Sequence, residues 1–294
     1  MPSFPLPPPA GGCPQSFFSY GSAEASALAI SAQDVIDAAA RIRGVPHRTP
    51  VLTSATFDEM SGLNLYFKCE NLQKTGSFKV RGATNGIRQL SAEQKAKGVV
   101  THSSGNHAQA VALAAREAGI PATIIMPENS PLVKVNAVKG YGATVVMCAP
   151  TQAAREAAAD KAIAETGGFF IPPYNHPWTM AGQGTLAIEL LEQVAEMGVP
   201  KLDAVVVPVG GGGMISGCSV YLSSQGVRTI GAEPLGADDA ARSKAAYLAA
   251  GGAEQADGPS GVGVGSVVPP PCGQDEGGPR TVGDGLKTTL GDLV

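Results

Sequence analysis

The 294-residue sequence has few aromatic residues, no regularly spaced cysteines and no excess of basic charge. Aromatic residues make up 5% and Trp178 is the single tryptophan, so we expect a core of Ala, Val, Ile and Leu, which suits a parallel sheet covered by helices. The five cysteines contain no C-x-x-C pair, which argues against a zinc site and against a disulfide framework. Reduced thiols in an intracellular compartment are the expectation.

Charge and hydropathy argue against two further classes of protein. The formal net charge is -4, with no basic stripe of the kind that binds nucleic acid. No apolar run reaches the roughly 18 to 20 residues that span a bilayer. Residues 1–29 are rich in Pro, Ser, Ala and Gly but lack the basic start of a signal peptide, and we interpret them as a disordered leader. We expect a soluble, cytoplasmic protein, with organelle targeting by this leader as the alternative.

The rest of the chain alternates between strand and helix patterns. A helix capped by Ser31 or by Gln33 and Asp34 opens the folded region. The alternation predicts an α/β fold with parallel sheets, helices on both faces and right-handed crossovers. Strands are predicted at 65–68, 98–101, 122–126, 144–146, 204–208 and 228–233, and helices at 78–90, 108–118, 131–141, 151–166, 185–197 and 214–225.

The two series of elements predict two lobes. A small lobe, residues 98–174, is inserted into a large lobe formed by residues 30–97 and 175–294. Residues 251–279 are so rich in Gly, Pro, Ala and Ser that we predict a flexible insertion there. Open parallel sheets bind ligands beyond the carboxyl ends of their strands, so the loops that enter helices are the places to search for a site.

The strongest local signal is the segment KTGSFKVRGA at residues 74–83, which enters a helix. A lysine that attacks an aldehyde must be held in place and be available as the free base, and we expect neighbouring Arg81 to make Lys79 lose its proton more readily. Lys79 is therefore the predicted nucleophile. The alternative is a surface lysine whose stem lies along its helix.

The segment THSSGNHAQA at residues 101–110 joins a strand end to an alanine-rich helix. Free backbone N–H groups and the positive end of the helix dipole should face an approaching carboxylate there, and Gly105 lets the main chain come close. The alternative is that Ser103, Ser104 and Asn106 only cap the helix.

A run of four glycines, Gly210 to Gly213, lies between a predicted strand and a predicted helix. Consecutive glycines let several N–H groups converge on one anion, as a phosphate requires. A simple turn or linker is the alternative interpretation.

The acidic segment GAEPLGADDA at residues 231–240 could bind a hard divalent cation. Glu233, the carbonyl of Ala237 and Asp239 could supply three oxygen ligands, and waters could complete an octahedron. The alternative is that these acids cap a helix or face water.

These four motifs, in this order, resemble the serine racemase and serine/threonine dehydratase family of pyridoxal 5'-phosphate (PLP) enzymes of fold type II, which have the tryptophan synthase β-like fold. The resemblance runs from about Gln33 to Asp284. It implies that Lys79 carries the cofactor and that Ser104 is the second catalytic residue, on the opposite cofactor face. The implied cofactor contacts are Phe78, Asn106, Asn175, Gly210, Gly211, Gly212, Gly213 and Met214. The implied substrate contacts are Ser103, Ser104, Gly105, Asn106 and His107.

The resemblance also implies regulatory ligands and an activity. Mg2+, or Ca2+ or Mn2+, would bind at Glu233, Ala237 and Asp239, and ATP would bind as an activator at Lys74, Thr75, Gln109 and Tyr141. Ordinary surface or core roles are alternatives for these last four residues, and a structural role in a turn is the alternative for Asn175. The implied activity is the interconversion of L- and D-serine, with β-elimination of serine to pyruvate and ammonia, in a homodimer.

The end of the chain departs from the family. Nothing after Leu286 can supply the serine-containing loop that contacts the pyridine nitrogen in relatives, so we expect a truncated C-terminus. Two alternatives follow: a threonine or serine dehydratase without racemase activity, and a truncated, non-catalytic PLP-binding relative.

Overall fold

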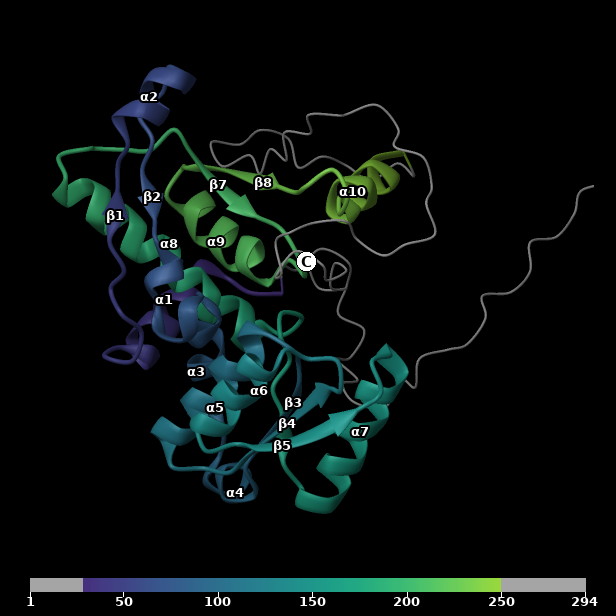
Figure 1. Ribbon diagram of the computed structural model, residues 1–294. Coiled ribbons are helices and arrows are strands. Elements are labelled where there is room, and N and C mark those ends of the chain that lie inside the picture. The colour runs from purple at the N-terminus through teal and green to yellow at the C-terminus, as the bar shows by residue number, and fades with distance from the viewer. Residues whose placement is uncertain (1–28, 250–294) are drawn as a thin grey trace, which may run out of the picture.

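The computed structural model of the protein describes residues 29–249 (Figure 1). The predicted leader up to residue 28, the predicted insertion at 251–279 and the predicted C-terminal truncation lie outside these residues. In the described part, no helix combines the length and the apolar character needed to cross a membrane.

One group of elements is built on a four-stranded parallel sheet in the order β5-β4-β3-β6. Its strands are β3 (Val99–His102), β4 (Ala122–Pro127), β5 (Thr144–Cys148) and β6 (Phe169–Phe170). The connecting helices are α5 (Asn106–Ala118), α6 (Leu132–Gly140) and α7 (Gln152–Thr166). Val99 and Ile124 belong to the apolar cluster formed with α5 and α6, whereas the next residues, Val100 and Ile125, belong to the cluster formed with α7. This alternation is the two-residue period of a sheet covered on both faces.

A second group of elements surrounds the long helix α8 (Pro177–Glu196), which contacts α1 (Ala32–Ile42), α3 (Lys79–Gln89) and α9 (Gly213–Ser224). The parallel strands β7 (Ala204–Pro208) and β8 (Arg228–Ala232) lie next to α9 (Figure 1). The remaining elements are β1 (Val51–Leu52), α2 (Ala55–Ser61), β2 (Phe67–Lys68), the 3-10 turns η1 (Glu70–Leu72) and η2 (Lys74–Gly76), α4 (Ala92–Lys97) and α10 (Asp239–Ala249).

Most of the predicted elements are present, and the α/β class is confirmed. Ser31 caps α1 and forms a reciprocal capping box with Asp34. The helix predicted from residue 185 begins at Pro177 instead, with His176 as its cap. Gly182 and Gly184 obscured this start because glycine disfavours helix, yet both lie where neighbouring backbone leaves no room for a side chain.

Candidate active site

A cavity of about 850 Å³ collects three of the predicted motifs. It lies at the carboxyl ends of β3 and β7, where each strand gives way to a helix, as expected for an open parallel sheet. Its lining includes Phe78, Lys79, Ser103, Ser104, Gly105, Asn106, His107, Gly210, Gly211, Gly212, Gly213 and Met214.

Lys79 is the first residue of α3, and it is partly buried at the wall of the cavity. The Nζ donates a hydrogen bond to the carbonyl of Pro173 at 2.7 Å and lies 5.3 Å from the ring centre of Phe78 and 5.9 Å from that of Tyr174. Burial lowers the pKa of this amine from 10.5 to about 8, because a charged ammonium loses hydration there. A useful fraction of Lys79 is therefore the free base near neutral pH.

The predicted influence of Arg81 on Lys79 is wrong. Arg81 is completely buried, and its guanidinium pairs with Glu70 and with Glu189 at 2.8 Å each. Two carboxylates offset its positive charge, so burial is the cause of the lowered Lys79 pKa.

The first turn of α5 is open to a ligand. Gly105 is the residue before the helix, and no side chain caps it; the Ser103 hydroxyl instead accepts a hydrogen bond from the Gly105 N–H at 3.2 Å. The helix-capping alternative is thus not what the structure shows. Backbone N–H groups at an uncapped helix start suit a carboxylate.

His107 is a neutral, buried member of this turn. Its Nε2 lies 2.9 Å from the carbonyl of Ile171, which can only accept, so Nε2 carries the proton. Burial lowers the pKa of this imidazole to about 3, and the Nδ1 atom has no hydrogen-bond partner among residues 29–249.

The glycine run forms a tight turn between β7 and α9. Gly212 has a φ of 85°, which favours glycine, and no side chain caps α9. A Cβ on Gly211 would lie 2.5 Å from the Tyr174 ring, and one on Gly213 would lie 2.9 Å from the Tyr174 carbonyl. The turn therefore places an uncapped helix start at the cavity with no side chains of its own, which is the environment that a phosphate needs.

The acidic segment does not form a cation site in this structure. Glu233 accepts hydrogen bonds from the N–H groups of Ala240 and Ala241 at 2.9 and 2.8 Å, so it caps α10. Across residues 29–249, no three His, Cys, Asp or Glu side chains gather as metal ligands. Ligation by Glu233 would require the first turn of α10 to give up these two bonds, while Ala237 is buried and Asp239 begins α10.

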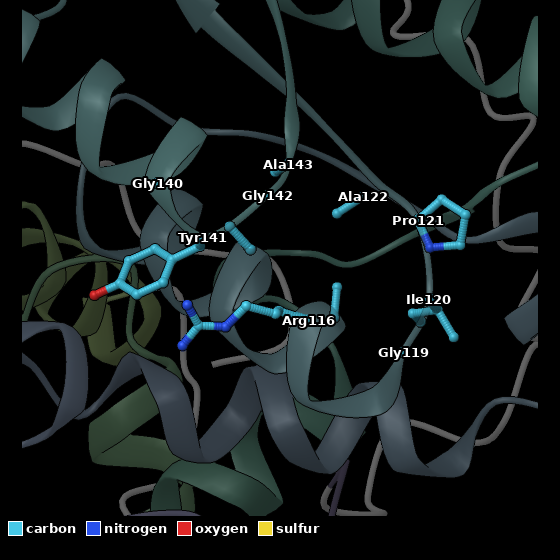
Figure 2. A pocket seen from close by; sticks show the side chains of 11 residues that line it. Arg116, Gly119, Ile120, Pro121, Ala122, Gly140, Tyr141, Gly142 and Ala143 are labelled. Atoms are coloured by element: carbon cyan, nitrogen blue, oxygen red, sulfur yellow. The ribbon is translucent and has the colours of Figure 1, made fainter.

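The four residues predicted to bind ATP do not share one cavity. Tyr141 lines a separate cavity of about 390 Å³, where the Arg116 guanidinium lies 5.1 Å from its ring centre (Figure 2). Lys74 forms an ion pair with Glu117 at 3.1 Å. Thr75, Gln109 and, among the predicted PLP contacts, Asn175 line neither cavity.

Several residues of the large cavity were not predicted from the sequence. Tyr174 packs against the glycine turn, and Arg155, Gln152 and His102 line the cavity near the start of α7. The start of α7 follows the carboxyl end of β5. Because open parallel sheets bind ligands beyond the carboxyl ends of their strands, this position could have identified Arg155 from the sequence.

Known proteins resemble the chain over most of its length. The model of the family described as pyridoxal-phosphate dependent enzyme matches residues 42–275. The serine racemase of Arabidopsis thaliana is 47% identical over 256 residues, which cover 86% of this chain and 69% of that protein. The beta-hydroxyaspartate dehydratase of Paracoccus denitrificans is 48% identical over 265 residues, which cover 89% and 75%. The solved structure of maize serine racemase matches with a TM-score of 0.77 and 43% identity over 90% of this chain and 72% of that one.

Proposed function

This chain belongs to the pyridoxal-phosphate dependent enzymes, and on that premise we propose that it interconverts L- and D-serine and also eliminates water from serine, giving pyruvate and ammonia. One observation carries the proposal: the Lys79 amine, the uncapped start of α5 and the glycine turn all open on one cavity. An amine, a carboxylate site and a phosphate site are what PLP and an amino acid require together.

The residues of the cavity fit the cofactor. Lys79 would bind its aldehyde carbon, and the turn from Gly210 to Gly213 would hold its phosphate. Phe78, Asn106 and Met214 would surround the ring, with Asn175 nearby. When bound, PLP supplies an electron sink that stabilises negative charge at the α-carbon of the substrate.

The protein's own groups would then handle the substrate and its proton. The N–H groups at the start of α5, with Ser103, Gly105 and His107, would hold the α-carboxylate. The Lys79 amine would take the α-proton on one face, since its pKa of about 8 is close to the working pH. Ser104 would return a proton on the other face. Loss of the β-hydroxyl instead would give an unsaturated product that hydrolyses to pyruvate and ammonia.

The test uses purified protein incubated with PLP. Borohydride reduction should fix the cofactor on the Lys79 peptide, as seen by mass spectrometry, and Lys79→Ala should abolish this labelling. With L-serine, we expect both D-serine and pyruvate, and Ser104→Ala should lose D-serine formation while it retains pyruvate formation. Label at another lysine would overturn the assignment, and pyruvate without D-serine would favour a dehydratase.

A second candidate substrate is a 3-hydroxy amino acid with an additional carboxylate. Arg155 and His102 both line the cavity. The pKa of His102 is lowered by burial and, to a smaller extent, by the positive charge of Arg155. Arg155 is therefore a cation available to bind a second anionic group of the substrate. One similar protein is a beta-hydroxyaspartate dehydratase. Arg155→Met should reduce kcat/KM for 3-hydroxyaspartate by about 100-fold and for serine much less. Equal losses for the two substrates would remove this candidate.

The regulatory ligands and assembly are further parts of the proposal. Mg2+, or Ca2+ or Mn2+, would bind at Glu233, Ala237 and Asp239 after rearrangement of the α10 start, and ATP would bind near Lys74, Thr75, Gln109 and Tyr141. The support for these sites, for a homodimer and for a small lobe at residues 98–174 is the family resemblance of the sequence motifs. Calorimetric titration of MgCl2 into wild type and Glu233→Gln tests the metal site directly.

A further inference from the structure

A dipeptide after strand β6, Pro173–Tyr174, contacts both the reactive lysine and the glycine turn. We call this dipeptide the spacer. Both of its residues line the large cavity, as Lys79 and the glycines do. Neither residue has a role in the proposed function, so the reason for this double contact is open to inference.

The spacer holds the Lys79 amine through its backbone and its ring. The Pro173 carbonyl accepts the hydrogen bond from Lys79 Nζ at 2.7 Å, and the centre of the Tyr174 ring lies 5.9 Å from the same nitrogen. An ammonium within about 6 Å of an aromatic ring centre is attracted to the ring. The position of the amine is thus tied to the position of the spacer.

The spacer also packs against the glycine turn, and so closely that side chains are excluded. A Cβ on Gly211 would lie 2.5 Å from atoms of the Tyr174 ring, and a Cβ on Gly213 would lie 2.9 Å from the Tyr174 carbonyl oxygen. Carbon atoms in contact normally lie about 3.5 to 4.0 Å apart, so both positions require glycine. The turn therefore rests directly on the ring and the main chain of Tyr174.

The segment that carries the spacer is stiff. Pro172 and Pro173 have restricted φ angles and no N–H groups. The Pro172 carbonyl accepts a hydrogen bond from the Thr179 hydroxyl at 3.1 Å, which ties the segment to α8. Just before the prolines, the Ile171 carbonyl accepts a hydrogen bond from the Thr101 hydroxyl at 2.8 Å, which ties it to β3. The spacer cannot move far without the loss of these bonds.

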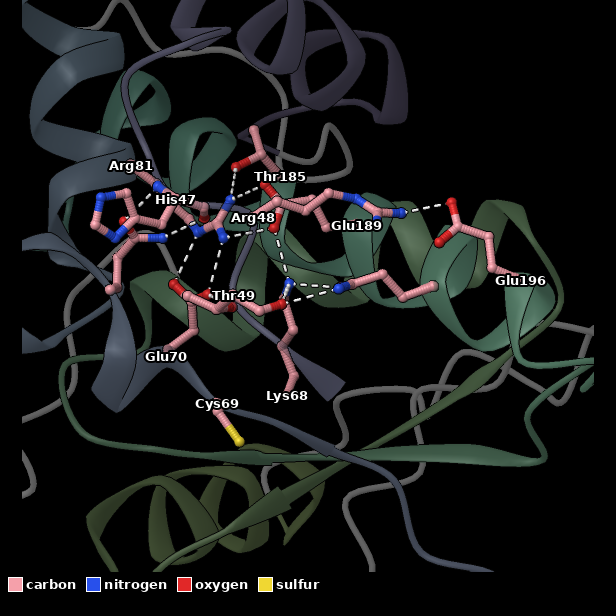
Figure 3. Close-up of polar contacts among 12 residues, drawn as sticks. His47, Arg48, Thr49, Lys68, Cys69, Glu70, Arg81, Thr185, Glu189 and Glu196 are labelled. Carbon is pink, nitrogen blue, oxygen red and sulfur yellow. Dashed lines mark hydrogen bonds and ion pairs between the residues drawn. The ribbon is translucent and has the colours of Figure 1, made fainter. Parts of the chain in front are cut away.

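The main chain of Lys79 is fixed by other contacts. Arg81, two residues further along α3, is completely buried and pairs with Glu70 and Glu189 at 2.8 Å each (Figure 3). Because α3 and the spacer are both held in place, the amine and the glycine turn have a defined separation. The group that contacts both of them is the spacer.

We propose that the spacer sets the separation between the Lys79 amine and the glycine turn, so that Tyr174 is a positioning residue for ligands that carry an aldehyde and a phosphate at that separation. The inference rests on the proposed roles of Lys79 and the turn. Two binding groups of one ligand reinforce each other only when their sites are held at the matching distance. A ligand without phosphate gains nothing from this spacing.

The experiment compares PLP with pyridoxal, which carries the same aldehyde but no phosphate. Full-length apo protein is incubated with each compound over a range of concentrations, and borohydride fixes the bond to Lys79. Mass spectrometry of the Lys79 peptide then gives the concentration for half-maximal labelling. The ratio of the two concentrations is the preference for PLP, and it is measured without substrate turnover.

Loss of the Tyr174 ring should reduce this preference. Tyr174→Ala removes the support of the turn, so we expect the preference for PLP over pyridoxal to fall by about tenfold or more, with a much smaller change in labelling by pyridoxal. Tyr174→Phe keeps the ring and should keep the preference. A merely structural role would weaken labelling by both compounds equally, and an unchanged preference in Tyr174→Ala would therefore overturn the proposal.

A matched control lies four residues earlier in the chain. Phe170→Ala also removes an aromatic ring, but this ring packs against His102, with 5.3 Å between the ring centres, so the preference should not change. A fall in Phe170→Ala would show that the effect does not belong to the spacer. If Tyr174→Ala does not fold, Tyr174→Leu also lacks the flat ring and should show the same loss. Absence of PLP labelling at Lys79 in the wild type would instead contradict the proposed function.

Discussion

At the scale of single residues, the reactive group and the stability of the fold oppose one another. Burial makes the free base of the Lys79 amine available, because it lowers the pKa of the amine to about 8. At neutral pH, however, most molecules of the folded protein still hold this amine as a desolvated ammonium, which costs free energy. A side chain that serves chemistry in this way reduces the free energy of unfolding of the apo protein.

Replacement of this lysine should therefore stabilise the apo protein. In the unfolded chain Lys79 keeps its proton up to pH 10.5, and in the folded protein it loses the proton near pH 8, so the unfolded state binds more protons in this window. The unfolding free energy of the wild type should rise by about 3 kcal/mol across the window relative to Lys79→Met. At pH 7 the variant should be more stable by about that amount. Urea unfolding of both proteins at several pH values checks this, and parallel pH profiles would contradict it.

The sequence predicted residues that the structure brings to one cavity, but it did not predict the surroundings that set their properties. Lys79, the serine-containing loop and the glycines were identified because their local settings, a strand end followed by a helix, can be recognised in a short segment. The surroundings of Arg81 could not be predicted in this way, since Glu189 is 108 positions away along the chain. Likewise, Glu233 resembled a metal ligand because its partners, the N–H groups of α10, belong to a helix that the sequence pattern did not predict.

At the scale of elements, α3 and α8 approach one another through glycine. A Cβ on Gly182 would lie 2.6 Å from the Cα of Gly82, and the Gly82 N–H donates to the Gln183 side chain at 3.1 Å. This close contact holds the helix that begins with Lys79 against α8. It also explains why helix propensity misplaced the start of α8 by eight residues, because packing overrode local preference.

Two glycines on α3 provide a matched test of that contact. Gly82→Ala would place a Cβ 2.8 Å from the carbonyl of Thr179, so we expect a loss of about 2 to 3 kcal/mol in unfolding free energy. Gly86→Ala would meet Ile171 at an ordinary 3.7 Å and should be neutral or stabilising by up to about 1 kcal/mol, since alanine favours helix. Denaturant unfolding of the two variants measures the difference, and similar losses in both would mean that the close approach has no energetic role.

At the scale of the whole molecule, the cavity joins segments from distant parts of the chain. Lys79 belongs to α3, the serine-containing loop follows β3, and the glycine turn follows β7. A ligand that contacts all three binds the folded chain and not the unfolded one, so it should stabilise the protein as a unit.

Binding of PLP should therefore raise the thermal midpoint. At a concentration one hundred times its Kd, the stabilisation should be about 2.7 kcal/mol. Gly211→Ala would place a Cβ 2.5 Å from the Tyr174 ring and displace the turn, so it should abolish most of this gain. Gly140→Ala, which has open space around the added Cβ, is the control and should retain the gain. Thermal unfolding with and without PLP distinguishes the variants, and an undiminished gain in Gly211→Ala would place the phosphate elsewhere.

The order of the segments has a consequence for synthesis of the protein. The four-stranded sheet is complete once residue 170 is available, because β6 pairs directly with β3. Arg81, however, precedes that sheet in the chain and finds Glu189 only after α8 has been made. On the ribosome, where the N-terminal part emerges first, Arg81 has Glu70 as a partner from the start but lacks its second carboxylate, Glu189, while the four-stranded sheet can already form. Maturation of the reactive lysine should thus be a late event in folding, coupled to the arrival of α8.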